Sequence, residues 1–277
     1  MIDLGTQPLG HTIPSADLDA DRLDYLIDML GIVELPVVLD VFPRHDNAEA
    51  RDAARRRGRD GLGADGLLPE GRVHPDVEAW LRILEQPERY VSGRGIARPA
   101  DPNSQITRVC AATNHVGSVI ARRSGASVLI RPLAEDHPAR ILDALGSGRG
   151  LNFQSALSRS EISAPTDLLA EALDAAPSDV DATAARLAHI GIEPDSARYL
   201  ASAMSTCSAH AEIVSAWNRD GTRVSGEHPV AFFDTHRGRI LATSSTAADG
   251  RRWTTMSSGT DGRVRSALAD IVDRTSR

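Results

Sequence analysis

The chain has 277 residues, with 31 basic and 38 acidic side chains and a formal net charge of -7 at pH 7. It contains no lysine, so every one of those basic side chains is an arginine. Without a lysine amine, a Walker-type phosphate loop, a Schiff base and a lysine general base are excluded. The negative balance, with arginines scattered singly or beside acids, argues against a nucleic-acid partner.

The cysteines and the apolar stretches bear on the location of the protein. Cys110 and Cys207 lie far apart within apolar stretches, which predicts reduced core thiols rather than a disulfide framework. No stretch approaches the roughly 20 apolar residues that a membrane span needs. Residues 1–14 lack the basic segment and apolar run of a signal peptide. We therefore expect a cytoplasmic protein without a membrane partner.

The first half of the chain predicts helices followed by strands. A first helix carries apolar residues at helical spacing from Leu23 to Leu30, with Asp17 and Asp19 as caps and Gly31 at its end. After an extended connection at 34–42, further helices are predicted at 47–58 and from Pro75 to just before Pro87. The period then changes to two, which predicts hairpin strands at about 89–98, 106–113, 117–123 and 126–131, before a helix at 137–145.

The second half repeats this order. Helices are predicted at 165–175, 179–190 and 194–204, strands at about 208–218, 229–234, 239–245 and 251–256, and a last helix around Leu268. The fold class is therefore α+β, in which three helices, four strands and one helix occur twice around a central antiparallel sheet. The alternative is a chance recurrence of a common alternation of elements.

We expect a single domain over residues 1–277, made of two related halves. The N-terminal half spans about 18–146, the linker about 147–163 and the C-terminal half about 164–277. Glycines at 146, 148 and 150 indicate the linker, because they break the preceding helix.

Tests for catalytic and metal-binding motifs are negative. His210-Ala211-Glu212 resembles the start of a zinc deaminase signature, but no PCxxC motif follows it. The chain contains neither a His-Glu-x-x-His motif nor a G-x-S-x-G elbow. The sequence thus predicts no catalytic residue, no cofactor and no metal, although a serine site assembled from distant residues stays open as an alternative.

Three short segments carry a resemblance to a known family. They are Leu35-Pro36-Val37-Val38-Leu39, Asp234-Thr235-His236-Arg237-Gly238-Arg239 and Asp249-Gly250-Arg251-Arg252-Trp253. In this order and spacing they resemble the EspG family, the secretion-associated proteins of type VII (ESX) systems, from about Leu18 to the C-terminus. The resemblance implies a non-enzymatic cytosolic chaperone that binds PE-PPE heterodimers through the tip of the PPE protein and keeps them soluble before export. It also implies a central antiparallel sheet and two helical bundles.

The resemblance also implies that the sheet and the second helical bundle form the partner surface. Within residues 194–233, the candidate contact residues are Arg198, Tyr199, Glu212, Val214, Trp217 and Phe232. Aromatic and arginine side chains dominate binding hot spots, which favours Trp217, Arg198 and Tyr199. The alternative is that Trp217 and Tyr199 belong to the core, and the sequence does not tell which alternating set of the strand at 212–217 faces the partner.

Two other functions are kept beside the chaperone hypothesis. A hydrolase would need an adjacent serine, histidine and aspartate in a deep pocket. A homodimeric scaffold would pair exposed edges of its sheet across a twofold axis, so self-association is a possible second partnership.

Overall fold

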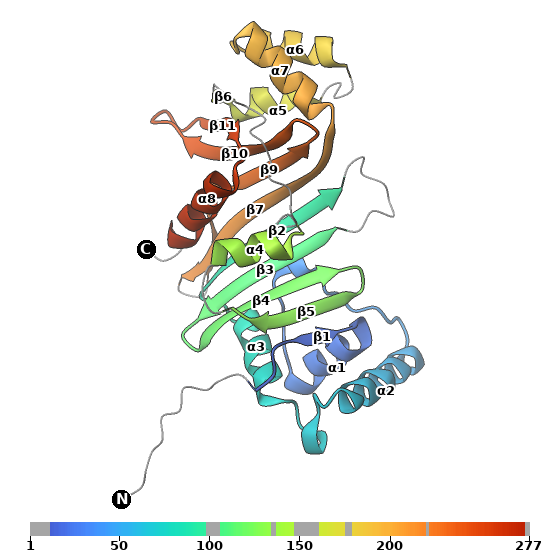
Figure 1. The fold of residues 1–277 in the computed structure, drawn as a ribbon. Coiled ribbons are helices and arrows are strands. Elements are labelled where there is room, and N and C mark those ends of the chain that lie inside the picture. The colour runs from blue at the N-terminus through green and yellow to red at the C-terminus, as the bar shows by residue number, and fades with distance from the viewer. Residues whose placement is uncertain are drawn as a thin grey trace, which may run out of the picture.

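The computed structural model of the chain describes residues 12–97, 106–133, 137–146, 161–174, 179–219 and 222–274. It is a mixed helix and sheet fold built on one large antiparallel sheet (Figure 1). The first half runs in the order β1 (Ala16–Leu18), α1 (Ala20–Leu30), η1 (Val37–Leu39), α2 (Ala48–Ala64), η2 (Pro69–Gly71), α3 (Pro75–Glu85), β2 (Arg89–Ala97), β3 (Thr107–Asn114), β4 (Gly117–Ser124), β5 (Ser127–Pro132) and α4 (His137–Ala144). The second half runs in the order β6 (Ile162–Pro165), α5 (Thr166–Asp174), α6 (Val180–His189), α7 (Pro194–Met204), β7 (Cys207–Arg219), β8 (Thr222–Ser225), β9 (Val230–Thr235), β10 (Gly238–Thr246), β11 (Arg252–Ser258) and α8 (Asp261–Arg274).

The predicted helices and strands are confirmed, with differences at several ends. Helix α2 continues past Gly58 to Ala64, and the segment at 34–42 contains the short helix η1. Strands β1, β6 and β8 were not predicted, because three or four residues are too few to establish a period. Strand β6 begins inside the predicted linker, and residues 147–160 of that linker lie outside the described residues.

Local capping explains where the first helix begins and ends. The Asp19 carboxylate accepts a hydrogen bond of 2.9 Å from the backbone N–H of Arg22, as expected for an N-cap. Gly31 ends the helix with a φ of 63°, a left-handed conformation that glycine adopts without strain. Asp17, the other predicted cap, lies in β1 instead.

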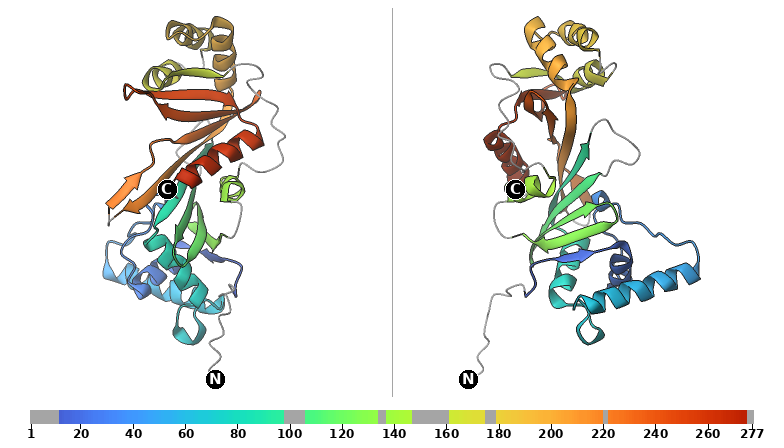
Figure 2. Two further views of the ribbon diagram at one scale, coloured as in Figure 1. Left: turned by 90° about the vertical axis from the view of Figure 1, so that its left-hand side faces the viewer. Right: turned by 45° about the vertical axis from the view of Figure 1, so that its right-hand side comes forward.

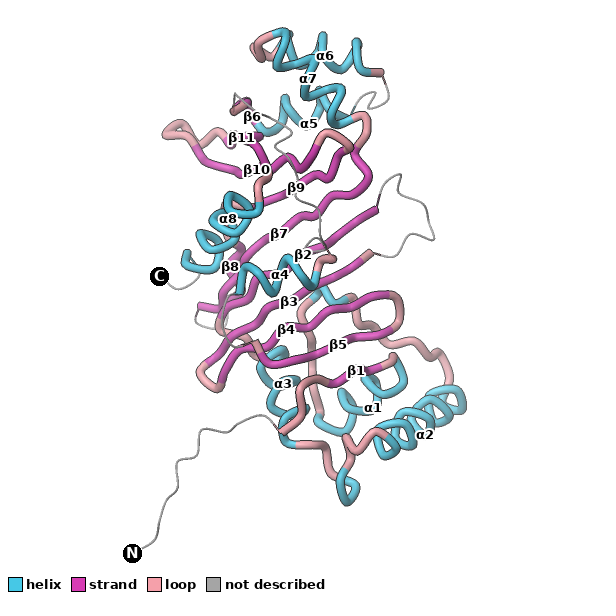
Figure 3. Tube along the Cα trace, viewed as in Figure 1, coloured by secondary structure: helices cyan, strands magenta, loops and turns pink. Residues whose placement is uncertain are grey.

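The sheet joins the two halves through their first long strands. Its strand order is β1-β5-β4-β3-β2-β7-β9-β10-β11-β6, with β8 paired to β7, and neighbouring strands are antiparallel. Strands β2 and β7 therefore lie at the centre, where Val91 is opposite Ser215. Figure 3 shows the strands as one layer, with helices gathered at its two ends and with α4 and α8 over its middle.

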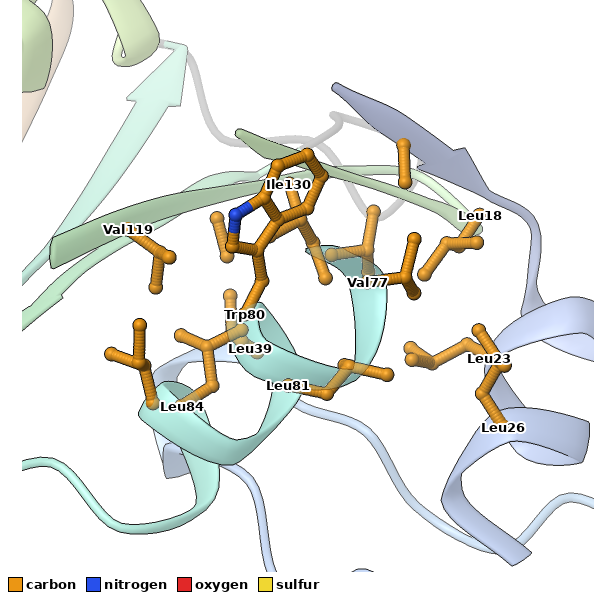
Figure 4. Close-up of a cluster of buried hydrophobic side chains, with 14 of the residues drawn as sticks. Leu18, Leu23, Leu26, Leu39, Val77, Trp80, Leu81, Leu84, Val119 and Ile130 are labelled. Carbon is orange, nitrogen blue, oxygen red and sulfur yellow. The ribbon is translucent and has the colours of Figure 1, made fainter. Parts of the chain in front are cut away.

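Helices cover the two faces of the sheet in different places. On β3, Cys110 and Ala112 pack in a core cluster with α1, α3 and η1, whereas Val109 and Ala111 pack in a second cluster with α4 and α8. Side chains alternate between faces along a strand, so these two clusters lie on opposite faces. Figure 4 shows the first cluster, in which Trp80 of α3 lies beneath the strands.

A third cluster shares the face of the first. On β10, Ile240 and Ala242 pack with helices α5 to α7, whereas Leu241 belongs to the cluster of α4 and α8. The register through β3, β2, β7, β9 and β10 puts Cys110 and Ala242 on one face, because directly paired residues point the same way. Thus α4 and α8 cover the middle of one face, and the two helical groups cover the ends of the other (Figure 2).

Candidate partner-binding surface

The middle of the face opposite α4 and α8 carries a row of side chains that we call the central strip. It consists of His210, Glu212 and Val214 of β7, Arg94 of β2 and Phe233 of β9. Glu212 is directly opposite Arg94, and His210 is directly opposite Phe233, so all of them point to the same face. The central strip lies between the two helical groups.

Part of the central strip is exposed to solvent. Val214 is 44% exposed, which is unusual for a valine in the middle of a central strand. Arg94 Nη2 lies 2.9 Å from Glu212 Oε2, and the two side chains are 55% and 47% exposed. An ion pair at this exposure contributes little to stability, so both groups are available to a partner.

A buried histidine supports the exposed part of the strip. His210 is 8% exposed, and its ring stacks on Phe233 with a centroid distance of 6.0 Å. Its Nε2 lies 3.9 Å from Glu212 Oε1. The strip therefore places the Arg94–Glu212 charge pair between Val214 on one side and the stacked His210 and Phe233 on the other, a mixture of apolar and charged groups that is common in protein interfaces.

Helix α7 borders the strip at the C-terminal end. The Arg237 guanidinium lies 5.1 Å from the centroid of the Tyr199 ring, which ties the β9–β10 turn to the helix. Arg198 Nη2 and Asp181 Oδ1 are 3.9 Å apart with side chains 74% and 86% exposed, so Arg198 is free to move. At the start of the helix, backbone hydrogen bonds from Asp195 and Ser196 lower the pKa of Glu193.

The six predicted contact residues do not share one face. Glu212 and Val214 lie on the central strip, whereas Trp217 points to the α4 and α8 side by strand alternation and is half-buried. Phe232 is 1% exposed within the cluster of α4 and α8, so its side chain is a core residue and cannot meet a partner. The adjacent Phe233 points to the opposite face, because a shift of one residue reverses the face, and there it is partly buried against the cluster of helices α5 to α7.

The segment Asp234 to Arg239 has a structural role within its hairpin. Arg239 is 1% exposed, and its Nε donates a hydrogen bond of 2.6 Å to Asp234 Oδ1. The Arg239 guanidinium also lies 4.5 Å from the centroid of the Phe232 ring. In the segment Asp249 to Trp253, which joins β10 to β11, Gly250 adopts a φ of 81° that its turn requires.

Metal-binding clusters and membrane-spanning helices are absent from the part of the chain that the structure describes. Within it, no group of three or more histidine, cysteine, aspartate or glutamate side chains could hold a metal ion. Among the described helices, none is both long and apolar enough to cross a membrane.

Comparison with known proteins identifies the family. The model of the EspG family matches residues 19–270. The chain belongs to the EspG family. This match spans both halves and every strand of the sheet except β1, in agreement with the resemblance of the three short segments.

Individual members and a solved structure agree with this assignment. The ESX-3 secretion-associated protein EspG3 of Mycobacterium tuberculosis is 28% identical over 269 residues, which cover 93% of this chain and 90% of that protein. The ESX-1 secretion-associated protein EspG1 of the same species is 23% identical over 242 residues, which cover 86% and 80%. The fold is similar to that of the M. tuberculosis type VII secretion system chaperone EspG5, solved in complex with the PE25-PPE41 dimer, with a TM-score of 0.75, 18% identity and coverage of 94% and 96%.

Proposed function

We propose that this protein is a cytoplasmic chaperone of type VII secretion that binds a PE-PPE heterodimer through the PPE protein without catalysing a reaction. The observation that carries the proposal is family membership over nearly the whole chain, together with the fold of a chaperone solved with a PE-PPE dimer. Such a chaperone needs no reactive group. It needs a surface that covers an apolar tip of its client and prevents the client from self-associating.

The central strip supports this proposal physically. Val214 offers an exposed apolar contact, and the neighbouring Arg94 and Glu212 offer charges of both signs. Arg198 and Tyr199 of α7 extend the surface toward the C-terminal helices. We infer that the client lies across the strip between the two helical groups, with Val214 near the middle of the contact.

Co-expression tests the proposal. The chain is expressed with each PE-PPE pair of its own genome, and the soluble fraction is compared with that of the pair alone. The proposal predicts that at least one pair stays soluble only when the chain is present. The hydrolase hypothesis replaces the chaperone hypothesis if every pair is equally soluble with and without the chain and a serine-directed probe labels the chain.

We also propose that the two halves, residues 18–146 and 164–277, are related by a pseudo-twofold axis between β2 and β7. The strand order supports this, because β2-β3-β4-β5-β1 on one side is matched by β7-β9-β10-β11-β6 on the other. Helices α4 and α8 follow equivalent strands and pack side by side on the same face. In an experimental structure, superposing β2 to β5 on their counterparts should bring α4 onto α8, and a failure to do so would contradict the duplication.

A further inference from the structure

Large apolar side chains are exposed on the segment between α1 and α2, residues 32–45, which we call the strap. Val33 is 93% exposed, Phe42 is 62% exposed and Val37 is 56% exposed. Single exposed apolar residues are ordinary, but a group of them on one short segment is typical of an interaction site. The central strip does not include these residues.

A pocket of about 630 Å³ lies between the strap and the helices α1 and α2. Its apolar wall includes Ile27, Leu35, Val41 and Ala54. A mostly apolar hollow of this volume, with a few polar groups, is of the size that binds a ligand or the anchoring side chains of a partner.

Several charges at the pocket are already paired. Arg44 Nη2 lies 2.6 Å from Asp21 Oδ1 and 2.8 Å from Asp24 Oδ2, and Arg55 pairs with Asp28. These pairs tie the strap and α2 to α1. They hold the charged part of the pocket lining in place.

Other polar groups at the pocket have no such partner. Within the described ranges, neither Arg51 nor Glu34 has an ion-pair partner, and both are exposed. His45 Nε2 is buried and has no hydrogen-bond partner among the described residues. Unpaired groups of both signs beside an apolar hollow are suited to an anchor flanked by charged side chains.

The strap continues the central strip toward the N-terminal helices. Its helix η1 contacts β2 and β3, and Arg123 Nη1 donates a hydrogen bond of 2.7 Å to the Leu39 carbonyl. Arg108 Nη2 lies 3.0 Å from Asp40 Oδ2, and Arg108 is the cross-strand neighbour of Arg94. In the right-hand view of Figure 2 the strap lies on the other side of the sheet from α4 and α8. The strap and the central strip therefore adjoin on one face of the sheet, where a single partner can contact both.

We propose that the strap and its pocket form a second contact surface for the same client that the central strip binds. The pocket receives a large apolar side chain of the PPE protein, flanked by a carboxylate that pairs with Arg51 and a basic group that pairs with Glu34. This inference rests on the proposed chaperone function. It assigns the N-terminal helices a part in client recognition, beside the sheet and α7.

Affinity measurements on purified proteins test this inference. The PE-PPE heterodimer that co-purifies with the chain is immobilised, and its Kd is measured for the unaltered chain, Phe42→Ser, Val33→Ser and the control Val116→Ser. Val116 is 61% exposed on the β3–β4 turn, so the control removes a comparable exposed side chain that belongs neither to the strap nor to the central strip. The inference predicts at least about tenfold weaker binding for Phe42→Ser and Val33→Ser and an unchanged Kd for the control.

The possible outcomes separate this inference from the chaperone function. If the heterodimer binds and all three variants match the unaltered chain, the strap inference is overturned and the chaperone function stands. If no heterodimer binds the unaltered chain, both fail. If the unaltered chain is a dimer that Phe42→Ser converts to a monomer with unchanged client affinity, a second copy occupies the pocket and the inference is again overturned.

Discussion

Arg239 and Asp234 face each other across the β9–β10 hairpin, and Arg239 is held by both oxygens of the Asp234 carboxylate. The Nε–Oδ1 and Nη2–Oδ2 distances are 2.6 and 3.0 Å, and the Arg239 side chain is 1% exposed. A guanidinium buried this deeply is stable only with a partner that compensates for its lost hydration.

Removing one partner of this pair should therefore lower the free energy of unfolding more than removing both partners does. We predict that Asp234→Ala lowers the free energy of unfolding by about 3 kcal/mol, because it removes both carboxylate hydrogen bonds from the buried Arg239 charge. The double variant Asp234→Ala, Arg239→Met should recover part of this loss. Urea unfolding measures both, and equal losses for the single and double variants would contradict the account.

Two glycines of α2 offer a matched test of how closely α1 and α2 pack. A Cβ at Gly58 would lie 2.2 Å from the Asp21 carbonyl oxygen, whereas a Cβ at Gly63 meets no atom within 4 Å. We predict that Gly58→Ala lowers stability by about 2 kcal/mol, because the two helices must move apart. Gly63→Ala should leave stability unchanged or raise it by about 0.5 kcal/mol. Thermal unfolding of the pair checks this, and similar effects at both positions would rule out the close approach.

The two thiols should differ in reactivity. Burial raises the pKa of Cys110 to about 12, so its thiol stays protonated and shielded at pH 8. Cys207 is partly exposed, and its Sγ lies 3.2 Å from the Ala209 carbonyl oxygen. Iodoacetamide at pH 8 should add one label to the folded chain and two to the urea-unfolded chain, as counted by intact mass. Labelling of Cys110 in a folded Cys207→Ser variant would contradict the burial.

The two faces of β7 predict opposite effects for two substitutions. Val214→Asp should weaken binding of the PE-PPE heterodimer at least about 30-fold with little change in stability, because Val214 lies exposed on the central strip. Trp217→Ala should lower stability and leave the affinity of the folded protein unchanged, because Trp217 points to the α4 and α8 side. Isothermal titration calorimetry measures the affinities, with Val116→Asp as the control. A reversed order of the two affinities would place the client on the α4 and α8 face.

The order of helices and strands could be predicted from the sequence because each long element has a clear period. The apolar stripe of α3 is visible in the residues, and its members Val77, Trp80, Leu81 and Leu84 are buried in the structure. Strands β1 and β6 escaped prediction because each forms only by pairing with a distant strand, as Ala16 does with Ile130. Such pairing leaves no local pattern.

The partner surface was harder to predict for a related reason. Phe232 and Phe233 are neighbours, so one must point into the core, but their own chemistry does not tell which. The choice depends on helices α4 and α8, which lie far away in the sequence and cover the Phe232 side. The exposed strap residues Val33 and Phe42 gave no sequence signal either, because an exposed apolar residue looks the same as a buried one until its neighbours are placed.

The central claim is that this chain forms a stable complex with a PE-PPE heterodimer. Size-exclusion chromatography with light scattering measures it directly, on the tagged chain purified after co-expression with each pair of its own genome. The account predicts one peak whose mass equals one copy each of the chain, the PE protein and the PPE protein. Separate elution of the chain from every pair, with each partner soluble and folded, would contradict it.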